Sequence, residues 1–377
     1  MITLELEQLC LLEMIKASLF SVSPTIPNNV NWEKVFVLAK TQCVVQLIAS
    51  YVPNDYRPEW RNIEYQSKAH YMQMLYEQNQ LIKLLDENKI PYVILKGTAA
   101  AKYYPVPSLR TFGDVDFYVA NDFFDTAVRL LQNNNYRFIS NNDRQYAFEK
   151  NGVEFELHKR ISRQGNFIDN TIQNNILYSV NCSIDKCSFL CLPKYENGLV
   201  LLWHIMHHLQ ASGIGFRQII DWMMFVHKEL DDSSWNNQFR PLAAQAGLEK
   251  LAIIVTYMCK KWLGLPDDIT WCNTADEETS DQLLARILYD GNFGAERSLF
   301  ENVKFTASKE GIFRYLQRTG MTTWVFAQKH SVFRPFAWIY QLFRLLFQGV
   351  SGLIKGRRVF RKNKHLVRLN DFLKKLK

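Results

Sequence analysis

The sequence predicts an α+β protein in which a small mixed sheet is flanked by helical regions on both sides. Residues 3–90 carry apolar positions at helical spacing, and residues 195–289 return to that spacing. Between them, residues 91–160 show the alternation of strands. We therefore divide the chain into an N-terminal helical region (1–90), a sheet-containing core (91–160), a helical C-terminal domain (161–330) and an amphipathic, basic C-terminal tail (331–377).

The length and composition are those of a folded protein with more than one domain. The chain has 377 residues, of which 47% are hydrophobic and 22% are charged. A chain of this length forms two or three packed units, and this apolar content excludes an intrinsically disordered protein.

The net charge of +8 is concentrated at the C-terminus. Residues 355–377 contain ten Lys or Arg and one Asp, which leaves 35 basic and 36 acidic residues elsewhere. This distribution argues against a nucleic-acid groove spread over the fold. It favours a C-terminal element that meets an anionic surface, such as lipid headgroups or RNA, and the alternative is a solvated basic helix.

The cysteines and the N-terminus predict a cytoplasmic protein. Seven cysteines are scattered without a Cys-x-x-Cys pair, which fits a reducing compartment. The cluster of Cys182, Cys187 and Cys191 matches no common zinc spacing. The first residues lack the basic and apolar regions of a secretory signal.

The core elements follow from changes in period and from turn residues. Pro91 ends the N-terminal helices and starts a strand, and Lys150-Asn-Gly152 is typical of a hairpin turn. Asn121 is expected to cap the helix that follows it. The predicted elements are strands at 92–95, 115–119, 144–148 and 153–158, and helices at 98–104 and 122–134.

The C-terminal half begins with a segment, 161–195, that we predict to be rich in loops. Predicted helices follow at 195–209, 216–228, 248–263 and 281–289. The segment 336–354 is apolar except for a narrow stripe that includes Gln341 and Arg344. This pattern is compatible with a buried helix, an in-plane membrane helix or a spanning helix, although Arg344 would be costly in the last. The basic residues after it favour peripheral attachment to the inner face of a membrane.

Two neighbouring segments carry the residues that indicate chemistry. A predicted strand ends at Lys96-Gly97-Thr98, where glycine lets the backbone approach a phosphate group. Asp114 and Asp116 then flank Val115 on a second strand, so the two carboxylates share one face about 6 to 7 Å apart at their bases. Carboxylates placed in this way can share divalent metal ions.

A third acid is expected on the strand at 153–158. Glu154, Glu156 and His158 share one face of this strand, and the apolar residues between them share the other. Such a polar face needs a polar or metal-containing neighbour. The structural alternative is that the Asp-x-Asp pair lies at an exposed strand end and has no catalytic role. His204, His207 and His208 lie on one helical face, where packing is a commoner role than metal binding.

These motifs resemble a bacterial family of nucleotidyltransferases in the DNA polymerase beta-like superfamily. The resemblance rests on the runs 91–98, 104–107, 110–116 and 153–158, and extends weakly to His207, Arg217 and Asp221, so it covers roughly residues 90 to 225. By position, Gly97 matches the turn glycine, Thr98 replaces the usual serine, and Glu156 best matches the third acid.

The resemblance implies two-metal nucleotidyl transfer from an NTP to a hydroxyl acceptor. Asp114 and Asp116 would bridge two Mg²⁺ ions, with Mn²⁺ as an alternative, and Glu156 would complete the site and accept the proton of the acceptor. Glu154 or His158 could replace Glu156. Lys96 and Arg110 would neutralise the triphosphate, unless Arg110 simply pairs with Asp114 or Asp116. By analogy, His207, Arg217 and Asp221 would close over the nucleotide.

Two other functions are also compatible with the sequence. The Asp-x-Asp motif also occurs in nucleotide-sugar glycosyltransferases, although a helical N-terminal region is unlike theirs. A nucleotide-binding, membrane-associated module without turnover is the second alternative. The sequence contains no Walker loop, Gly-x-Ser-x-Gly or His-Glu-x-x-His motif, so ATPase, hydrolase and zinc-protease functions lack their characteristic residues.

Overall fold

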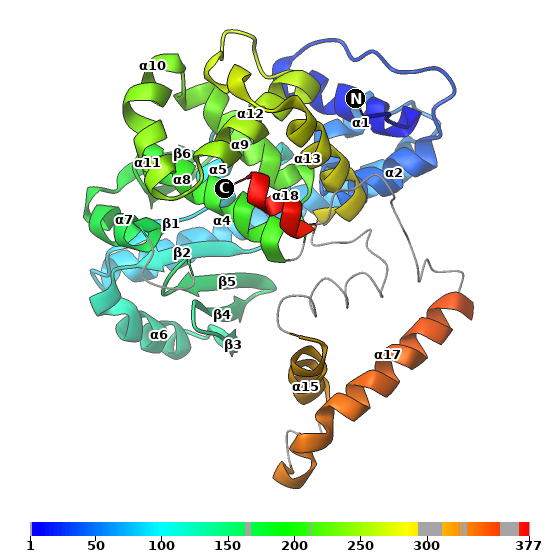
Figure 1. Ribbon diagram of the computed structural model, residues 1–377. Helices are drawn as coiled ribbons and strands as arrows, with labels where there is room; N and C mark the ends of the chain where they lie inside the picture. The colour runs from blue at the N-terminus through cyan, green and yellow to red at the C-terminus, as the bar shows by residue number, and fades with distance from the viewer. Residues whose placement is uncertain are drawn as a thin grey trace.

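A seven-stranded mixed sheet forms the centre of the computed structural model (Figure 1). The structure describes residues 2–162, 167–211, 213–292, 311–324, 326, 330–354 and 369–376. The strand order is β3-β4-β5-β2-β1-β7-β6. The strands are β1 (Tyr92–Ile94), β2 (Val115–Val119), β3 (Arg137–Asn141), β4 (Gln145–Lys150), β5 (Val153–His158), β6 (Val180–Ile184) and β7 (Cys187–Cys191).

Helices from both ends of the chain surround this sheet, and the predicted α+β class is confirmed (Figure 1). The N-terminal helices are α1 (Leu6–Phe20), α2 (Trp32–Thr41), α3 (Val45–Ile48) and α4 (Arg57–Glu87). Within the sheet region lie α5 (Gly97–Ala101), α6 (Phe124–Asn133) and α7 (Phe167–Asn175). The C-terminal helices are α8 (Lys194–Ala211), α9 (Phe216–Glu229), α10 (Asp232–Ser234), α11 (Arg240–Gln245), α12 (Glu249–Leu263), α13 (Glu277–Asp290), α15 (Ile312–Thr323), α17 (Ala337–Ile354) and α18 (Leu369–Lys375).

Strands β2 and β5 are neighbours and run parallel. Their register pairs Asp116 with Glu156 and Tyr118 with His158. On β5, Val153, Phe155 and Leu157 are fully buried in the core, as the alternation predicts. The register therefore brings the polar faces of both strands to the same side of the sheet.

Two apolar cores hold the fold together. One lies between the sheet, α4 and α6, and includes Leu81, Phe117 and Phe155. The other joins the N-terminal helices to the C-terminal helices, so that Leu11 and Leu283 belong to the same cluster. Residues far apart in the sequence therefore depend on a shared core, which fixes the C-terminal helices relative to the sheet.

The segment 161–195 differs from the prediction. Instead of loops it forms α7, a 3₁₀ turn (Ile176–Tyr178) and the antiparallel pair β6–β7, which extends the sheet through β1. Strand β3 was not expected either. All five of its residues are exposed, so it lacks the apolar alternation that identifies a half-buried strand.

Asn121 does not cap α6, contrary to the prediction. It lies inside a 3₁₀ turn (Asn121–Phe123), and its Oδ1 accepts a hydrogen bond of 3.1 Å from the hydroxyl of Tyr118. The preceding turn shifts the start of α6 to Phe124, so the asparagine stands too early in the chain to reach its first amides.

The cysteines depart from the expectation of a reduced chain. Cys182 on β6 and Cys191 on β7 form a disulfide, because the antiparallel pairing places both side chains on the same face of adjacent strands. Cys10, Cys43, Cys187, Cys259 and Cys272 are free thiols. The nine-residue separation of the bonded pair gave no sequence signal, since it depends on two strands that were not predicted.

The segment predicted to be an amphipathic helix forms α17, which packs against α15. Figure 1 shows these two helices projecting away from the sheet and its surrounding helices. Within the described ranges, no helix is both long enough and apolar enough to cross a membrane. The basic run 355–368 lies outside the described residues.

We expect Gly198→Ala to lower the free energy of unfolding by about 1–3 kcal/mol. A Cβ at Gly198, on α8, would lie 2.2 Å from Cζ of Phe225 on α9. The ring of Phe225 is fully buried and packs against Trp222 and Phe239, so it cannot move freely aside. Urea unfolding would measure the loss, with the exposed Lys194→Ala as control. Equal midpoints for the two variants would contradict this packing.

Candidate active site

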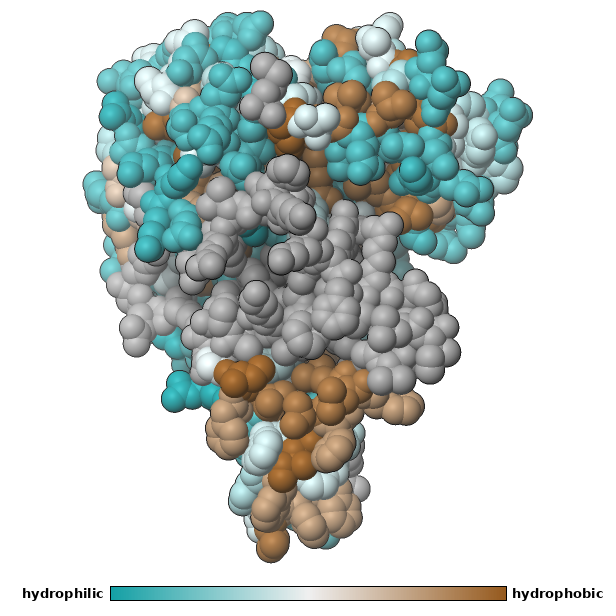
Figure 2. Space-filling view, turned by 45° about the vertical axis from the view of Figure 1, so that its right-hand side comes forward, coloured by the Kyte–Doolittle hydropathy of each residue, from teal (hydrophilic) through white to brown (hydrophobic). Residues whose placement is uncertain are grey.

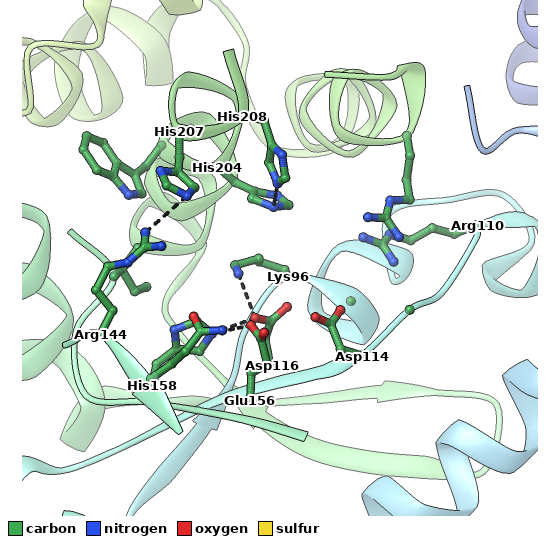
Figure 3. A pocket seen from close by; sticks show the side chains of 16 residues that line it. Lys96, Arg110, Asp114, Asp116, Arg144, Glu156, His158, His204, His207 and His208 are labelled. Carbon is green, nitrogen blue, oxygen red and sulfur yellow. Dashed lines mark hydrogen bonds and ion pairs between the residues drawn. The ribbon is translucent and has the colours of Figure 1, made fainter. Parts of the chain in front are cut away.

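The candidate site is a cavity of about 240 Å³ above the polar face of β2 and β5 (Figure 3). The strands and the turn after β1 supply the carboxylates and Lys96, while α8 and α9 supply the opposite wall. The lining residues are Lys96, Gly97, Arg110, Gly113, Asp114, Asp116, Arg144, Gln145, Glu156, His158, Ile161, Trp203, His204, His207, His208 and Arg217.

Asp116 is the centre of the polar cluster. Its Oδ1 accepts hydrogen bonds from Nζ of Lys96 at 2.7 Å and from Nε2 of His158 at 2.6 Å. The same Nε2 lies 3.7 Å from Oε2 of Glu156. One ligand atom each from Asp116, Glu156 and His158 all lie within 4.8 Å of one another. The parallel register of β2 and β5 produces this arrangement.

Asp114 faces the same cavity from the residue before β2, with its carboxylate beside that of Asp116 (Figure 3). It is not part of the three-residue group around His158. Burial and the neighbouring Asp116 raise the pKa of Asp114, while Lys96 and Arg217 act against that rise. The structure thus brings Asp114, Asp116 and Glu156 to one cavity, as the sequence predicted, and their catalytic roles stay a prediction.

Burial and neighbouring charges give Glu156 and Asp116 very different pKa values. The pKa of Glu156 rises to about 8, because its carboxyl is buried and faces Asp116 and Asp114. Burial would also raise the pKa of Asp116, but Lys96 and His158 outweigh it and hold that pKa well below its usual range. At neutral pH the metal-free cluster therefore holds an ionised Asp116 beside a protonated Glu156.

The pKa values of the two basic side chains that contact Asp116 shift in opposite directions. Burial alone would lower the pKa of Lys96, but Asp116, Glu156 and Asp114 outweigh it and raise that pKa. Burial and the charge of Lys96 lower the pKa of His158. The lysine is therefore charged and the imidazole neutral, with its Nε2–H donating to the carboxylate.

The turn between β1 and α5 has the unusual backbone that the glycine predicted. Gly97 has φ +22°, while a Cβ there would meet only an ordinary contact of 3.7 Å, so conformation rather than space favours glycine. Lys96 has φ 46° and ψ −127°, a region that costs a non-glycine residue about 1–3 kcal/mol. With this backbone, Nζ of Lys96 lies 2.7 Å from Oδ1 of Asp116.

Three predicted residues do not line the cavity, namely Thr98, Glu154 and Asp221. The hydroxyl of Thr98 donates a hydrogen bond of 2.9 Å to Oε1 of Gln78 on α4, and its side chain is buried there. Glu154 is exposed and does not line the cavity. For a hydroxyl contact to a nucleotide, Thr98 would have to leave its partner on α4.

Arg110 is held by Asp221 rather than by the Asp-x-Asp pair. Its Nε and Nη2 donate to the two carboxylate oxygens of Asp221 at 2.8 and 2.7 Å. The hydroxyl of Tyr104 donates to the same carboxylate at 2.9 Å. Asp221 is 1% exposed and does not line the cavity, so it anchors Arg110 instead of covering the nucleotide itself.

The wall opposite the carboxylates comes mainly from α8. Nε2 of His204 and Nε2 of His208 lie 2.7 Å apart, and Nη1 of Arg144 lies 3.2 Å from Nε2 of His207 (Figure 3). Burial lowers the pKa of His208 to about 3 and that of His204 well below its ordinary value. His204 and His208 are therefore neutral at physiological pH.

Arg144 and Trp203 line the cavity but were not predicted as site residues. Arg144 stands directly before β4, where nothing in the local sequence distinguishes it from a surface residue. Trp203 precedes the histidine group on α8, and the helical spacing of that group was the one signal that could have identified this wall.

The fold, the site and a family match together define the class of protein, a nucleotidyltransferase. Residues 28–264 match a family described as uncharacterised nucleotidyltransferases. The matched region covers more than half of the chain and contains the whole acidic cluster, so the chain belongs to this family. Its placement in the DNA polymerase beta-like superfamily stays a prediction.

A solved structure with a similar fold matches part of the chain. It is an antigenic nucleotidyltransferase-like protein from Paracoccidioides brasiliensis, with 17% sequence identity and a TM-score of 0.33, and the match covers 52% of this chain and 95% of that one. A TM-score this low carries no argument about the site. No functionally curated protein matches the sequence.

We expect the metal-free protein to become less stable as pH rises from 6.5 to above 8. The ordinary pKa of a Glu is 4.5 and that of Glu156 in the fold is about 8, so within this window the folded state holds a proton that the unfolded state has lost. Rising pH therefore favours unfolding. Melting temperatures in the presence of a chelator would measure this slope.

Glu156→Gln should flatten that slope, whereas Glu87→Gln, at an exposed acid on α4, should keep it. The window starts at 6.5 because the lowered pKa values of His204 and His208 destabilise the fold below that pH. An unchanged slope in Glu156→Gln would show that another group carries the proton.

Proposed function

We propose that the protein transfers a nucleoside monophosphate from an NTP to a hydroxyl acceptor in a metal-dependent reaction that releases pyrophosphate. The observation that carries this proposal is the convergence of Asp116, Glu156 and His158 within 4.8 Å, beside Asp114 and Lys96, in a member of a nucleotidyltransferase family. An exposed strand end would not bury its acids in this way.

The donor set fits a divalent cation. Carboxylate oxygens suit Mg²⁺, and the imidazole nitrogen of His158 also suits Mn²⁺. Glu156 keeps a proton because burial, Asp116 and Asp114 together outweigh the charge of Lys96, so a bound cation would favour its ionised form. We propose that Asp114, Asp116 and Glu156 hold one or two such ions. When bound, the metal would supply charge stabilisation at the phosphoryl oxygens.

The remaining steps belong to side chains of the chain itself. The acceptor oxygen forms a bond to the α-phosphorus, the bond from that phosphorus to the bridging oxygen breaks, and pyrophosphate leaves with the electron pair. Glu156, once a bound cation favours its ionised form, would be the group placed to take the proton of the acceptor. Lys96 stands at the carboxylates and would offset phosphate charge as a point cation.

Arg144, directly before β4, and Arg217, on α9, both line the cavity. They are the candidates for contacts to the β- and γ-phosphates, since guanidinium groups bind phosphate oxygens in pairs. Arg110 contributes positive charge at the edge of the cavity while it stays anchored on Asp221.

The decisive experiment is a screen of the four γ-labelled NTPs for release of labelled pyrophosphate with Mg²⁺ or Mn²⁺. The proposal requires metal-dependent release that is lost in Asp114→Asn and Asp116→Asn and kept in Asp125→Asn, at an exposed acid on α6. Turnover of UDP-sugars would indicate the glycosyltransferase instead. A melting shift with NTP and metal, but no product, would indicate a silent binding module.

We propose a cell-surface polysaccharide pathway as the setting, with a sugar phosphate as acceptor at the inner face of the membrane. The family resemblance and the basic C-terminal sequence support this setting. Incubation of the active enzyme with labelled NTP and separate sugar-phosphate, RNA and protein fractions would test it. Labelled RNA or protein, without labelled sugar phosphate, would exclude this acceptor.

A further inference from the structure

Helix α17 exposes large apolar side chains and buries a polar one, which is the reverse of a helix on the surface of a soluble protein. Phe343 and Phe347 are 66% and 74% exposed, and Leu342 and Leu346 are exposed beside them, whereas Gln341 is 3% exposed. We call these four exposed side chains the apolar face of α17. Polar residues normally lie outside and apolar ones inside, so this face is built to be covered.

Polar groups of this region form hydrogen bonds inside the helical hairpin of α15 and α17. Oε1 of Gln317 on α15 accepts a hydrogen bond of 3.2 Å from the amide of Trp338, and its Nε2 donates at 2.7 Å to the carbonyl of Arg334. A Cβ at Gly320 would lie 2.0 Å from the carbonyl oxygen of Ala337, so glycine permits the close approach of the two segments. The hairpin is therefore packed on one side and apolar on the other.

Further exposed apolar side chains lie close by in sequence, on α15 and on the 3₁₀ turn Ser331–Phe336. They are Ile312, Phe313, Val332, Phe333 and Phe336. Figure 2 shows hydrophobic side chains gathered over this projecting part of the molecule. The remaining described surface in that view is mostly hydrophilic.

The charge of the same part of the chain identifies the partner. Residues 311–370 contain twelve Lys or Arg and no Asp or Glu, although the rest of the chain has a net charge of −4. Six of these basic residues lie between Lys355 and Lys364, directly after α17. An apolar face followed by a purely basic run matches the interior and the headgroups of an anionic lipid surface.

We infer that the apolar face of α17 docks on a bilayer that contains anionic phospholipid. A second copy of the chain is a poorer partner, because two purely basic segments would face each other. RNA would satisfy the basic run, but aliphatic side chains such as Leu346 gain nothing from it. This attachment is independent of the reaction proposed above.

The test is co-sedimentation of the full-length chain with vesicles. Phosphatidylcholine vesicles with phosphatidylglycerol should bind the protein, and vesicles of phosphatidylcholine alone should bind it at least about tenfold more weakly. Phe343→Ser combined with Phe347→Ser should weaken binding to the anionic vesicles by about tenfold or more, because two large apolar side chains no longer leave water.

The matched control is Leu177→Ser combined with Tyr178→Ser. These side chains are 75% and 72% exposed, on the 3₁₀ turn that precedes β6, and their loss should leave vesicle binding unchanged. Arg357→Gln combined with Arg358→Gln should reduce the preference for anionic vesicles.

Three outcomes would overturn the inference. The first is equal sedimentation with and without anionic lipid. The second is a wild-type dimer that the double serine variant of α17 dissociates, with no vesicle binding. The third is binding to single-stranded RNA that survives this variant while vesicle binding is absent.

Discussion

Asp116→Asn is expected to reduce metal-dependent pyrophosphate release by about a thousandfold or more. Asp116 contacts Lys96 and His158 directly and shares the ligand cluster with Glu156, so it links three polar side chains of the cavity. Asparagine keeps the size of the side chain but removes the charge that a cation and the lysine both need. Rates with saturating NTP and metal would measure the loss.

The same substitution leaves Lys96 buried without its counterion, so instability has to be separated from chemistry. The double variant Lys96→Met, Asp116→Asn removes both charges and should recover melting temperature relative to Asp116→Asn, while activity stays lost. Asp125→Asn serves as the surface control. Wild-type rates in Asp116→Asn would remove Asp116 from the mechanism, and recovery of activity in the double variant would make its role structural.

Asp221→Ala is expected to lower the free energy of unfolding by about 3–5 kcal/mol. Arg110 and Asp221 are 5% and 1% exposed and form two hydrogen bonds with each other, so the variant leaves a buried guanidinium without its carboxylate. The pair links the segment before β2 to α9. Urea unfolding at neutral pH would measure the change.

Two further variants show whether this cost comes from the unpaired charge. Arg110→Met combined with Asp221→Leu should be clearly less destabilising than Asp221→Ala, since no isolated charge remains. Arg137→Ala breaks an ion pair with Glu149 in which the arginine is 70% exposed, and it should cost no more than about 1 kcal/mol. Equal losses in Asp221→Ala and Arg137→Ala would contradict the burial of the Arg110 pair.

Strands β1, β2, β4 and β5 could be predicted because their signals are local. Alternation on β5 separates Glu156 from Phe155 and Leu157, and the glycine turn after β1 announces an unusual backbone. The proximity of Glu156 to Asp116 needed one further step, a parallel pairing of their strands. The residue types left few other ways to satisfy two polar faces.

Other features depend on contacts between distant parts of the chain. Asp221 follows Arg110 by 111 residues, and no periodicity links the two. Strand β6 has mostly exposed residues, so its alternation is weak, and the Cys182–Cys191 disulfide depends on that strand. The role of α8 as the cavity wall comes from packing against the shared helical core, which local patterns do not encode.

The parallel register of β2 and β5 has a consequence for how this protein can vary. Asp116 and Glu156 are neighbours across backbone hydrogen bonds, so the length of the chain that connects their strands does not set their spacing. Insertions near the exposed β3 would leave the carboxylates in place. Loss of a single residue between Gly152 and Glu156 would instead turn the acid into the apolar core and bring a hydrophobic side chain to the cavity.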